Sequence, residues 1–416
     1  MAVSLLAREV SDLCLGKPAL RSLPISTSVA ETLQALKNSG DTFLTVWSCD
    51  HHHTSKPNPP AGLDGADDDG GVDKCICVGK VSMVDVICYL CREENLLSPS
   101  SAFGAPVSVL LPKLPGLVAH VEPSSRLLEA IDLILQGAKN LVVPLKNRYI
   151  SGSRRKQHPK LSPINSPTIH DGREFCWLTQ EDIIRFLLSS IGLFAPTPAL
   201  SIDTLGIIST DMLTIDYHSP ASSALEAISR SVADQTSVAI VDSDGILIGE
   251  LSPFTLACCD ESAAAAITTL TAGELMAYID CGGPPEDLVR VVMSRLKEQG
   301  LEAMLQEFCE ISCCTSNSSP SQSSSSSDEE SGNSTPSTTL RRSGKYTRSM
   351  SYSARMVRRA EAIVCHPKSS LVAVMIQAIA HRINYVWVID DDCSLVGIVT
   401  FGGMLKVFRE SFEAIA

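Results

Sequence analysis

The sequence predicts a mixed α/β (α+β) fold in which one structural unit is used four times. The same run recurs along the chain and begins at Pro123, Pro220 and Pro367, with Ser26 in place of the proline in the first copy. A serine stands two residues after each of these anchors. Short, continuous apolar runs follow in every copy, as is typical of sheets covered by helices. A repeat that survives long insertions indicates a chain built from copies of a single unit.

The second copy shows the elements of the unit most clearly. Apolar residues within 127–135 recur at helical spacing, and Gly137 ends this helix. Residues 140–145 form an apolar run that predicts a buried strand, and residues 175–178 predict a second one. Thr179 then caps another helix. The predicted order of the unit is therefore helix, strand, strand, helix.

The other copies repeat this order. In the third and fourth copies, Asp-Gly or Asp-rich residues connect the two strands, which indicates hairpins. The predicted strand pairs are 42–47 with 76–81, 237–241 with 246–251, and 385–389 with 395–399.

Long insertions interrupt the repeat and help to define its boundaries. Two of them, 50–73 and 147–172, fall between the strands of a unit, where a loop can grow outward at little entropic cost. A third, 282–345, starts with an amphipathic helical pattern at 285–308 and continues into a serine-rich tract. We expect the insertions to be largely disordered. The predicted units are 1–95, 103–195, 200–281 and 346–416.

Composition narrows the class of protein. The 416 residues carry a formal net charge of −13, which argues against nucleic-acid binding because a polyanion would be repelled. No apolar run approaches the roughly 20 residues that a membrane span requires. The 15 cysteines are odd in number and scattered through apolar runs, and the chain opens without a secretory signal, so we interpret them as reduced. We expect a cytoplasmic protein, with the nucleus as a further location.

The second strand of each unit leads into a recurring polar motif. Ser82 precedes Asp85 by three residues, and Thr179 precedes Asp182 in the same way; Thr400 holds the matching place in the fourth copy. A Ser/Thr at a strand-to-helix junction places its hydroxyl beside the free N–H groups of the first helical turn, which attract phosphate. An ionised carboxylate accepts two strong hydrogen bonds from a vicinal diol.

This repeated ending resembles the cystathionine-beta-synthase (CBS) domain. The chain resembles plant proteins made only of CBS domains, the CBSX type, which are related to gamma subunits of AMP-activated-type kinases. The resemblance implies two CBS-pair (Bateman) modules whose clefts bind AMP, ADP, ATP or S-adenosylmethionine. It also implies that the aspartates contact ribose and the Ser/Thr residues contact phosphate, which makes Ser82, Asp85, Thr179, Asp182 and Thr400 the expected nucleotide-binding residues.

The copies are not equivalent, and this limits the expected binding. Thr255 and Gly403 stand where the aspartate would be in the third and fourth copies, so we expect weak or no nucleotide binding by the second module. The implied role is a non-catalytic regulator of a protein partner, either an energy-sensing kinase complex or a thioredoxin-type protein. A homodimer is compatible with this class, and no catalytic motif is present.

Two other interpretations remain open. Ser/Thr followed by Asp is also a capping motif that stabilises a helix start without any ligand, which would leave a ligand-free interaction scaffold. Alternatively, the protein responds to metal or redox state through its cysteines and histidines. The residues for that role are close in sequence, but their spacing fits helix and strand faces better than a zinc knuckle, so we expect no metal site. They are Cys49, His51, His52, His53, Cys75, Cys77, Cys88 and Cys91.

Overall fold

The computed structural model describes residues 7–49, 75–145, 169–280, 284–316 and 361–415. The insertion at 50–73, most of that at 147–172, and the serine-rich tract lie outside these residues. The end of the second insertion does not, because His170 is 2% exposed and belongs to the folded core. The last residues of the 147–172 insertion therefore belong to the folded structure.

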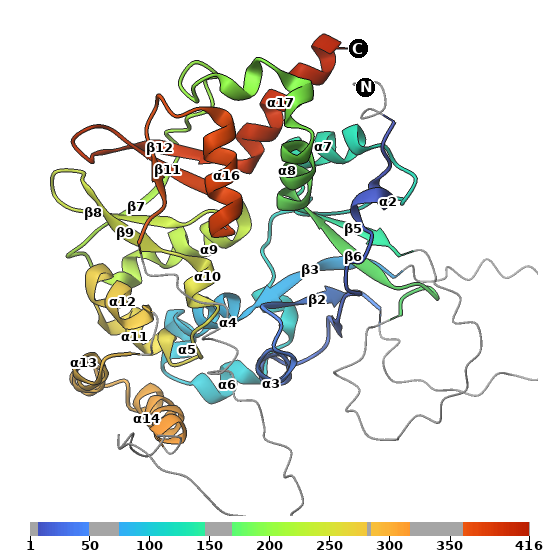
Figure 1. The fold of residues 1–416 in the computed structure, drawn as a ribbon. Helices are drawn as coiled ribbons and strands as arrows, with labels where there is room; N and C mark the ends of the chain where they lie inside the picture. The colour runs from blue at the N-terminus through green and yellow to red at the C-terminus, as the bar shows by residue number, and fades with distance from the viewer. Residues whose placement is uncertain (1–6, 50–74, 146–168, 281–283, 317–360, 416) are drawn as a thin grey trace, which may run out of the picture.

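Four three-stranded sheets confirm the predicted α/β class with its four repeats (Figure 1). Each sheet joins an antiparallel hairpin to a short parallel strand that comes just before the anchor residue and that the sequence analysis missed. The strands are β1 (Ser22–Pro24), β2 (Phe43–Trp47) and β3 (Cys77–Ser82); β4 (Val118–His120), β5 (Asn140–Pro144) and β6 (Phe175–Thr179); β7 (Leu213–Asp216), β8 (Val238–Val241) and β9 (Leu247–Leu251); and β10 (Val364–Cys365), β11 (Tyr385–Ile389) and β12 (Leu395–Thr400).

Two helices of each unit occupy the predicted places, one before the hairpin and one after it. They are α3 (Val29–Ser39) and α4 (Met83–Leu90), α7 (Leu127–Leu135) and α8 (Gln180–Ser189), α9 (Leu225–Asp234) and α10 (Pro253–Leu256), and α16 (Leu371–His381) and α17 (Phe401–Ile415). Local sequence explains the bounds of α3: Ser28 and Glu31 form a capping box at its start, and Gly40 ends it at φ +68°.

Shorter helices connect the units or precede them. These are α2 (Val10–Leu13), α5 (Glu93–Leu96), α6 (Pro99–Phe103), α11 (Ala263–Thr269) and α12 (Ala272–Ile279), with 3₁₀ turns at Val107–Leu110, Ile191–Phe194, Thr197–Ala199 and Ala221–Ala224.

The units pair through their sheets into two modules. In the first module, units 1 and 2 share a buried cluster that includes Trp47, Phe175 and Trp177. In the second, Glu250 of unit 3 accepts hydrogen bonds from Tyr385 of unit 4 across the interface. Sheet-to-sheet pairing is the arrangement that the CBS resemblance implies.

The modules then pack on each other through helices (Figure 1). Units 1 and 3 share one apolar core, in which α4 lies against α9 and α11. Units 2 and 4 share another, in which α7 and α8 lie against α16 and α17. An ion pair between Arg409 of unit 4 and Asp132 of unit 2, at 2.6 Å, joins these two units at the edge of their shared core. The cores therefore cross the boundary between modules.

Each half of the chain opens with a segment that docks on the second unit of that half. The Val10 N–H donates to the Ser125 carbonyl at 2.9 Å, and Val10 is fully buried in the core of units 2 and 4. In the second half, the Ile202 N–H donates to the Ser369 carbonyl at 3.0 Å. We call residues 7–20 and 197–208 the leading segments.

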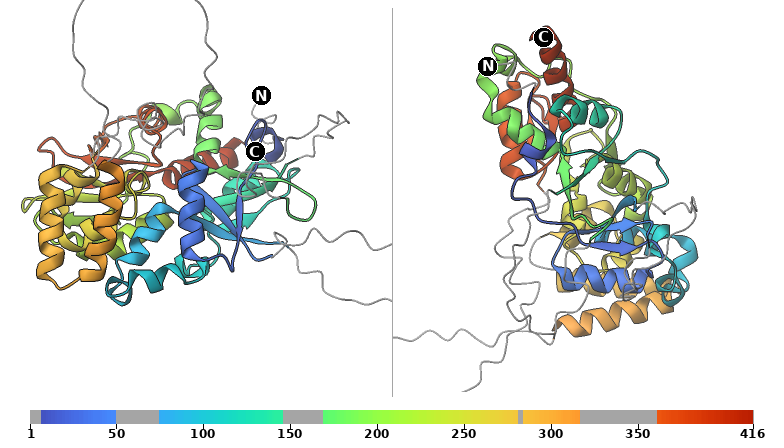
Figure 2. Two further views of the ribbon diagram at one scale, coloured as in Figure 1. Left: turned by 90° about the horizontal axis from the view of Figure 1, so that it is seen from below. Right: turned by 90° about the vertical axis from the view of Figure 1, so that its right-hand side faces the viewer.

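The amphipathic pattern at 285–308 forms two helices instead of the single helix predicted. These are α13 (Glu286–Glu298) and α14 (Glu302–Ser316), which lie side by side and cover α11 (Figure 2). Gly300 breaks the pattern because its φ of +70° is left-handed. Val292 and Leu296 are fully buried, so this hairpin is part of the folded core.

Among the described helices, none combines the length and apolarity that crossing a bilayer requires.

Candidate functional site

Ser82 and Asp85 lie at the junction between β3 and α4, as the sequence predicts. The backbone N–H and the hydroxyl of Ser82 both donate to Oδ2 of Asp85, each at 2.7 Å. Burial raises the pKa of Asp85, while the hydrogen bonds from Ser82 and the charge of Lys80 act in the lowering direction. Burial also lowers the pKa of Lys80, against the effect of Asp85. This first capping motif therefore places the Asp85 carboxylate and the Lys80 amine in surroundings that disfavour the charged form of both groups.

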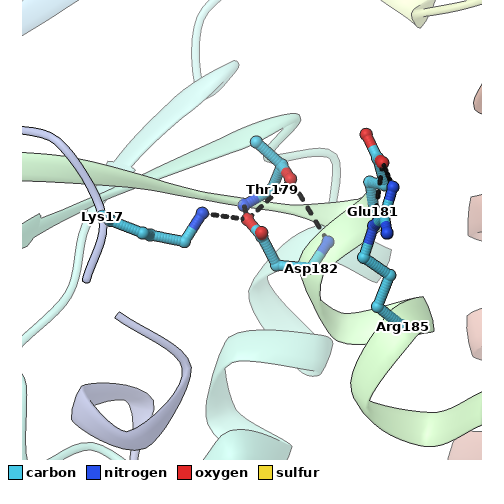
Figure 3. Close-up of polar contacts among 5 residues, drawn as sticks. All are labelled: Lys17, Thr179, Glu181, Asp182 and Arg185. Atoms are coloured by element: carbon cyan, nitrogen blue, oxygen red, sulfur yellow. Dashed lines mark hydrogen bonds and ion pairs between the residues drawn. The ribbon is translucent and has the colours of Figure 1, made fainter. Parts of the chain in front are cut away.

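Thr179 and Asp182 form the equivalent cap between β6 and α8 (Figure 3). The N–H and hydroxyl of Thr179 donate to Asp182 Oδ2 at 2.8 and 2.7 Å. Lys17, from the first leading segment, donates its Nζ to the same oxygen at 2.6 Å. Glu181 and Arg185 pair with each other on α8, so the partners of Asp182 among the described residues are Thr179 and Lys17.

The two aspartates share a feature that matters for a ligand. Every hydrogen bond that another described residue makes to Asp85 or Asp182 ends on Oδ2. Capping therefore engages one carboxylate oxygen in each case. Helix capping and an additional contact through Oδ1 are compatible.

The second module has caps without carboxylates. The Thr400 hydroxyl accepts from the Gly403 N–H at 3.3 Å, which caps α17. In the third copy, Thr255 is 6% exposed and packed inside. Neither Gly403 nor Thr255 can supply the ionised acceptor that Asp85 and Asp182 provide.

The paired sheets also differ in charge between the modules. In the first, Lys80 on β3 lies over the Phe43 ring, with its Nζ 5.6 Å from the ring centroid. In the second, the matching position on β9 is Glu250, which is 7% exposed. Tyr385 donates its hydroxyl to this carboxylate at 2.9 Å, and Trp387 donates its Nε1–H at 2.7 Å. The interior of the second module thus holds an acidic group where the first holds a basic one.

Most buried cysteines behave as ordinary core residues. Burial raises the pKa of Cys77 and of Cys88 to about 12, so both are neutral thiols at physiological pH. Cys91 is the C-cap residue of α4, and its thiol donates to the Ala264 carbonyl at 3.5 Å. Cys14 differs, because a hydrogen bond from Cys176 lowers its pKa and Lys17 acts in the same direction.

Sequence reasoning missed the residues that bond to these carboxylates from distant parts of the chain. Lys17 is 165 positions from Asp182, and Tyr385 is 135 positions from Glu250. Neither pair belongs to a motif, and nothing in the local pattern around Lys17 marks it. The symmetry of the repeat was the only available signal, since aligning the strand ends places Lys80 and Glu250 at one position.

Comparison with known proteins agrees with this architecture. The chain is 49% identical to the CBS domain-containing protein CBSX5 of Arabidopsis thaliana over 99% of both chains. It is 27% identical to CBSX6 of the same plant, over 100% of this chain and 96% of the relative. A third Arabidopsis relative, the SNF1-related protein kinase regulatory subunit gamma-like PV42b, is 20% identical over 57% of this chain and 63% of its own length. No family model matches.

A solved structure shares the fold. It is a protein of Methanocaldococcus jannaschii whose description relates it to g-AMPK, with a TM-score of 0.50 and 12% identity over 96% of this chain and 100% of its own. Four repeated units paired through their sheets define a CBS-domain protein with two CBS pairs. Given its full-length similarity to CBSX5, the chain belongs to the CBSX-type CBS domain-containing proteins of plants.

Proposed function

We propose that this chain is a non-catalytic regulatory protein that senses an adenosyl nucleotide through its first module. One observation carries the proposal: the first module places two capping carboxylates beside Lys17 and Lys80, whereas the second has lost both carboxylates and buries Glu250 instead. An anionic ligand with a ribose diol is favoured by nearby cations and carboxylate acceptors, and is disfavoured by a buried acid. Asp85 and Asp182 would receive the ribose hydroxyls, and the hydroxyls of Ser82 and Thr179 would face phosphate.

The ligand would act by bridging the two units of the first module. It can change a surface read by a partner only if it binds one arrangement of the units more tightly than another. We propose an energy-sensing kinase complex as the partner, supported by the relative described as a gamma-like regulatory subunit of a protein kinase, with a thioredoxin-type protein as the alternative. We place the protein in the cytoplasm, where cysteines such as Cys77 and Cys88 stay reduced.

Calorimetric titration of the full chain with AMP, ADP, ATP and S-adenosylmethionine tests the proposal. We expect one of the four to bind, and Asp85→Ala or Asp182→Ala to weaken it by about 10- to 100-fold, the equivalent of losing a hydrogen bond to a charged group. Glu31→Ala is a matched control, because Glu31 accepts the same capping bonds from Ser28, at 3.0 and 2.9 Å, away from the repeat junction.

The outcomes separate the alternatives. Binding that survives both aspartate substitutions would reject the proposed site. Heat from none of the four ligands would reject nucleotide sensing and favour a scaffold in which these residues only cap helices.

A further inference from the structure

A buried cluster of two thiols and an imidazole lies where the sheets of units 1 and 2 meet. Cys49 follows β2, Cys75 precedes β3, and His170 precedes β6. Their ligand atoms all lie within 4.8 Å of one another, and Cys49 Sγ is 3.1 Å from His170 Nδ1. The three residues are 5%, 3% and 2% exposed, respectively. Such convergence of soft donors in a dry site is unusual for residues this far apart in sequence.

The hairpin of unit 1 brings the two cysteines together. Its antiparallel ladder runs past the last paired residues of β2 and β3, since the Ser48 N–H donates to the Ile76 carbonyl at 2.9 Å. Cys49 and Cys75 therefore flank the open end of the hairpin on neighbouring strands. Their thiols face the cluster that unit 1 shares with unit 2.

A tight turn in unit 2 delivers the histidine. His170 and Arg173 exchange both backbone hydrogen bonds, each at 2.9 Å. The two residues between them, Asp171 and Gly172, have φ values of +49° and +73°, as a two-residue type I′ turn requires. An Asp-Gly pair is favoured in that turn, so His170 is held in place by local backbone chemistry.

Two further contacts orient the imidazole. Its Nε2 lies 2.8 Å from the hydroxyl oxygen of Ser22, and its ring stacks on Trp47 with centroids 3.7 Å apart and planes 5° apart. A metal-bound histidine usually donates its other ring N–H to an oxygen, which fixes the tautomer. Ser22 supplies such an oxygen at Nε2, and Nδ1 is then turned toward Cys49.

We propose that Cys49, Cys75 and His170 form a zinc-binding site that joins units 1 and 2. Thiolate and imidazole are the donors that zinc prefers, and tetrahedral coordination at Zn–S and Zn–N distances of about 2.3 and 2.0 Å separates the donor atoms by about 3.5–3.8 Å. The Cys49–His170 contact, at 3.1 Å, is a few tenths of an ångström shorter than this separation, and all donor atoms of the cluster lie within 4.8 Å of one another.

Among the described residues the cluster supplies three donors, so the fourth tetrahedral position would fall to a water molecule or another added ligand. Binding of Zn²⁺ would replace the two thiol protons, which pass to solvent, so that the ion bonds to two thiolates and a neutral imidazole. The ion would tie the hairpin of unit 1 to the turn of unit 2 and so limit how far the first module opens.

Metal analysis of the purified full chain tests this directly. We expect about one zinc ion per chain by mass spectrometry under non-denaturing conditions, and its loss in Cys49→Ser, Cys75→Ser and His170→Phe. The phenylalanine keeps a ring against Trp47 but removes the ligand. Cys88→Ser is the control, because Cys88 is also a buried thiol but lies outside the cluster, and its replacement should leave the zinc in place.

Cobalt substitution keeps the test valid if the variants fold poorly. After zinc is removed from the unmutated chain with a chelator, added Co²⁺ should give thiolate charge-transfer absorption and the visible bands of tetrahedral cobalt. A metal-free chain that takes up neither ion would overturn the proposal. So would a non-reduced mass lower by two hydrogens with Cys49 and Cys75 in one linked peptide, because that pair would then be a disulfide.

Discussion

Replacing Glu250 with alanine should destabilise the second module more than any single hydrogen-bond deletion in this interface. Glu250, Tyr385 and Trp387 are 7%, 4% and 0% exposed, so water cannot readily replace the lost acceptor. The variant removes the acceptor of two buried hydrogen bonds, one from the Tyr385 hydroxyl and one from the Trp387 Nε1–H, and each loss costs about 1–3 kcal/mol. We therefore expect the free energy of unfolding to fall by about 2–6 kcal/mol. Glu250→Gln retains an acceptor of similar size and should lose less.

Urea unfolding followed by circular dichroism measures this difference as a shift of the midpoint at unchanged slope. Tyr385→Phe is the matched comparison, because it removes one donor and leaves Glu250 bonded to Trp387. Both single variants remove the hydrogen bond between Tyr385 and Glu250, so the loss in the double variant Glu250→Ala with Tyr385→Phe should be smaller than the sum of the two single losses. A Glu250→Ala variant within about 0.5 kcal/mol of the unmutated chain would refute the reasoning.

Three other substitutions test separate parts of the structure. Lys17→Met should lower the free energy of unfolding by about 1–2 kcal/mol, because it removes the partner of a partly buried carboxylate; no change in a urea titration would contradict the pairing. Gly397→Ala should lower the melting temperature, since its Cβ would lie 2.7 Å from the Ser209 carbonyl oxygen; an unaltered melt would show that the backbone gives way. Arg295 lowers the pKa of Glu274, so Glu274 contributes stability above its unfolded pKa that is lost as pH falls through the folded value. The stability difference between the unmutated chain and Glu274→Gln should therefore vanish in acid, and a difference independent of pH would argue against it.

The features that could be predicted from the sequence are those that depend on neighbouring residues along the chain. Helical spacing, Asp-Gly turns and strand endings are short-range signals, so the four hairpins and their flanking helices could be read directly. The strands β1, β4, β7 and β10 could not, because two to four residues are too few to show alternation. Lys17 and His170 were missed for a different reason. Each meets its partner across more than one hundred positions of chain, 165 to Asp182 and 121 to Cys49, and only tertiary packing makes that pairing.

The leading segments indicate that a single unit of this chain is not a self-contained folding unit. A fragment ending at residue 95 would carry Val10 and Cys14 with no core to cover them, because both are buried against unit 2. The same fragment would lack Ala105 and Val107, whose backbones bond to the start of unit 1. A ribosome must therefore release the start of unit 2 before unit 1 can close. Because the leading segment and the two units of the first half depend on one another, the duplicated element of this protein is better regarded as a pair of units than as a single unit.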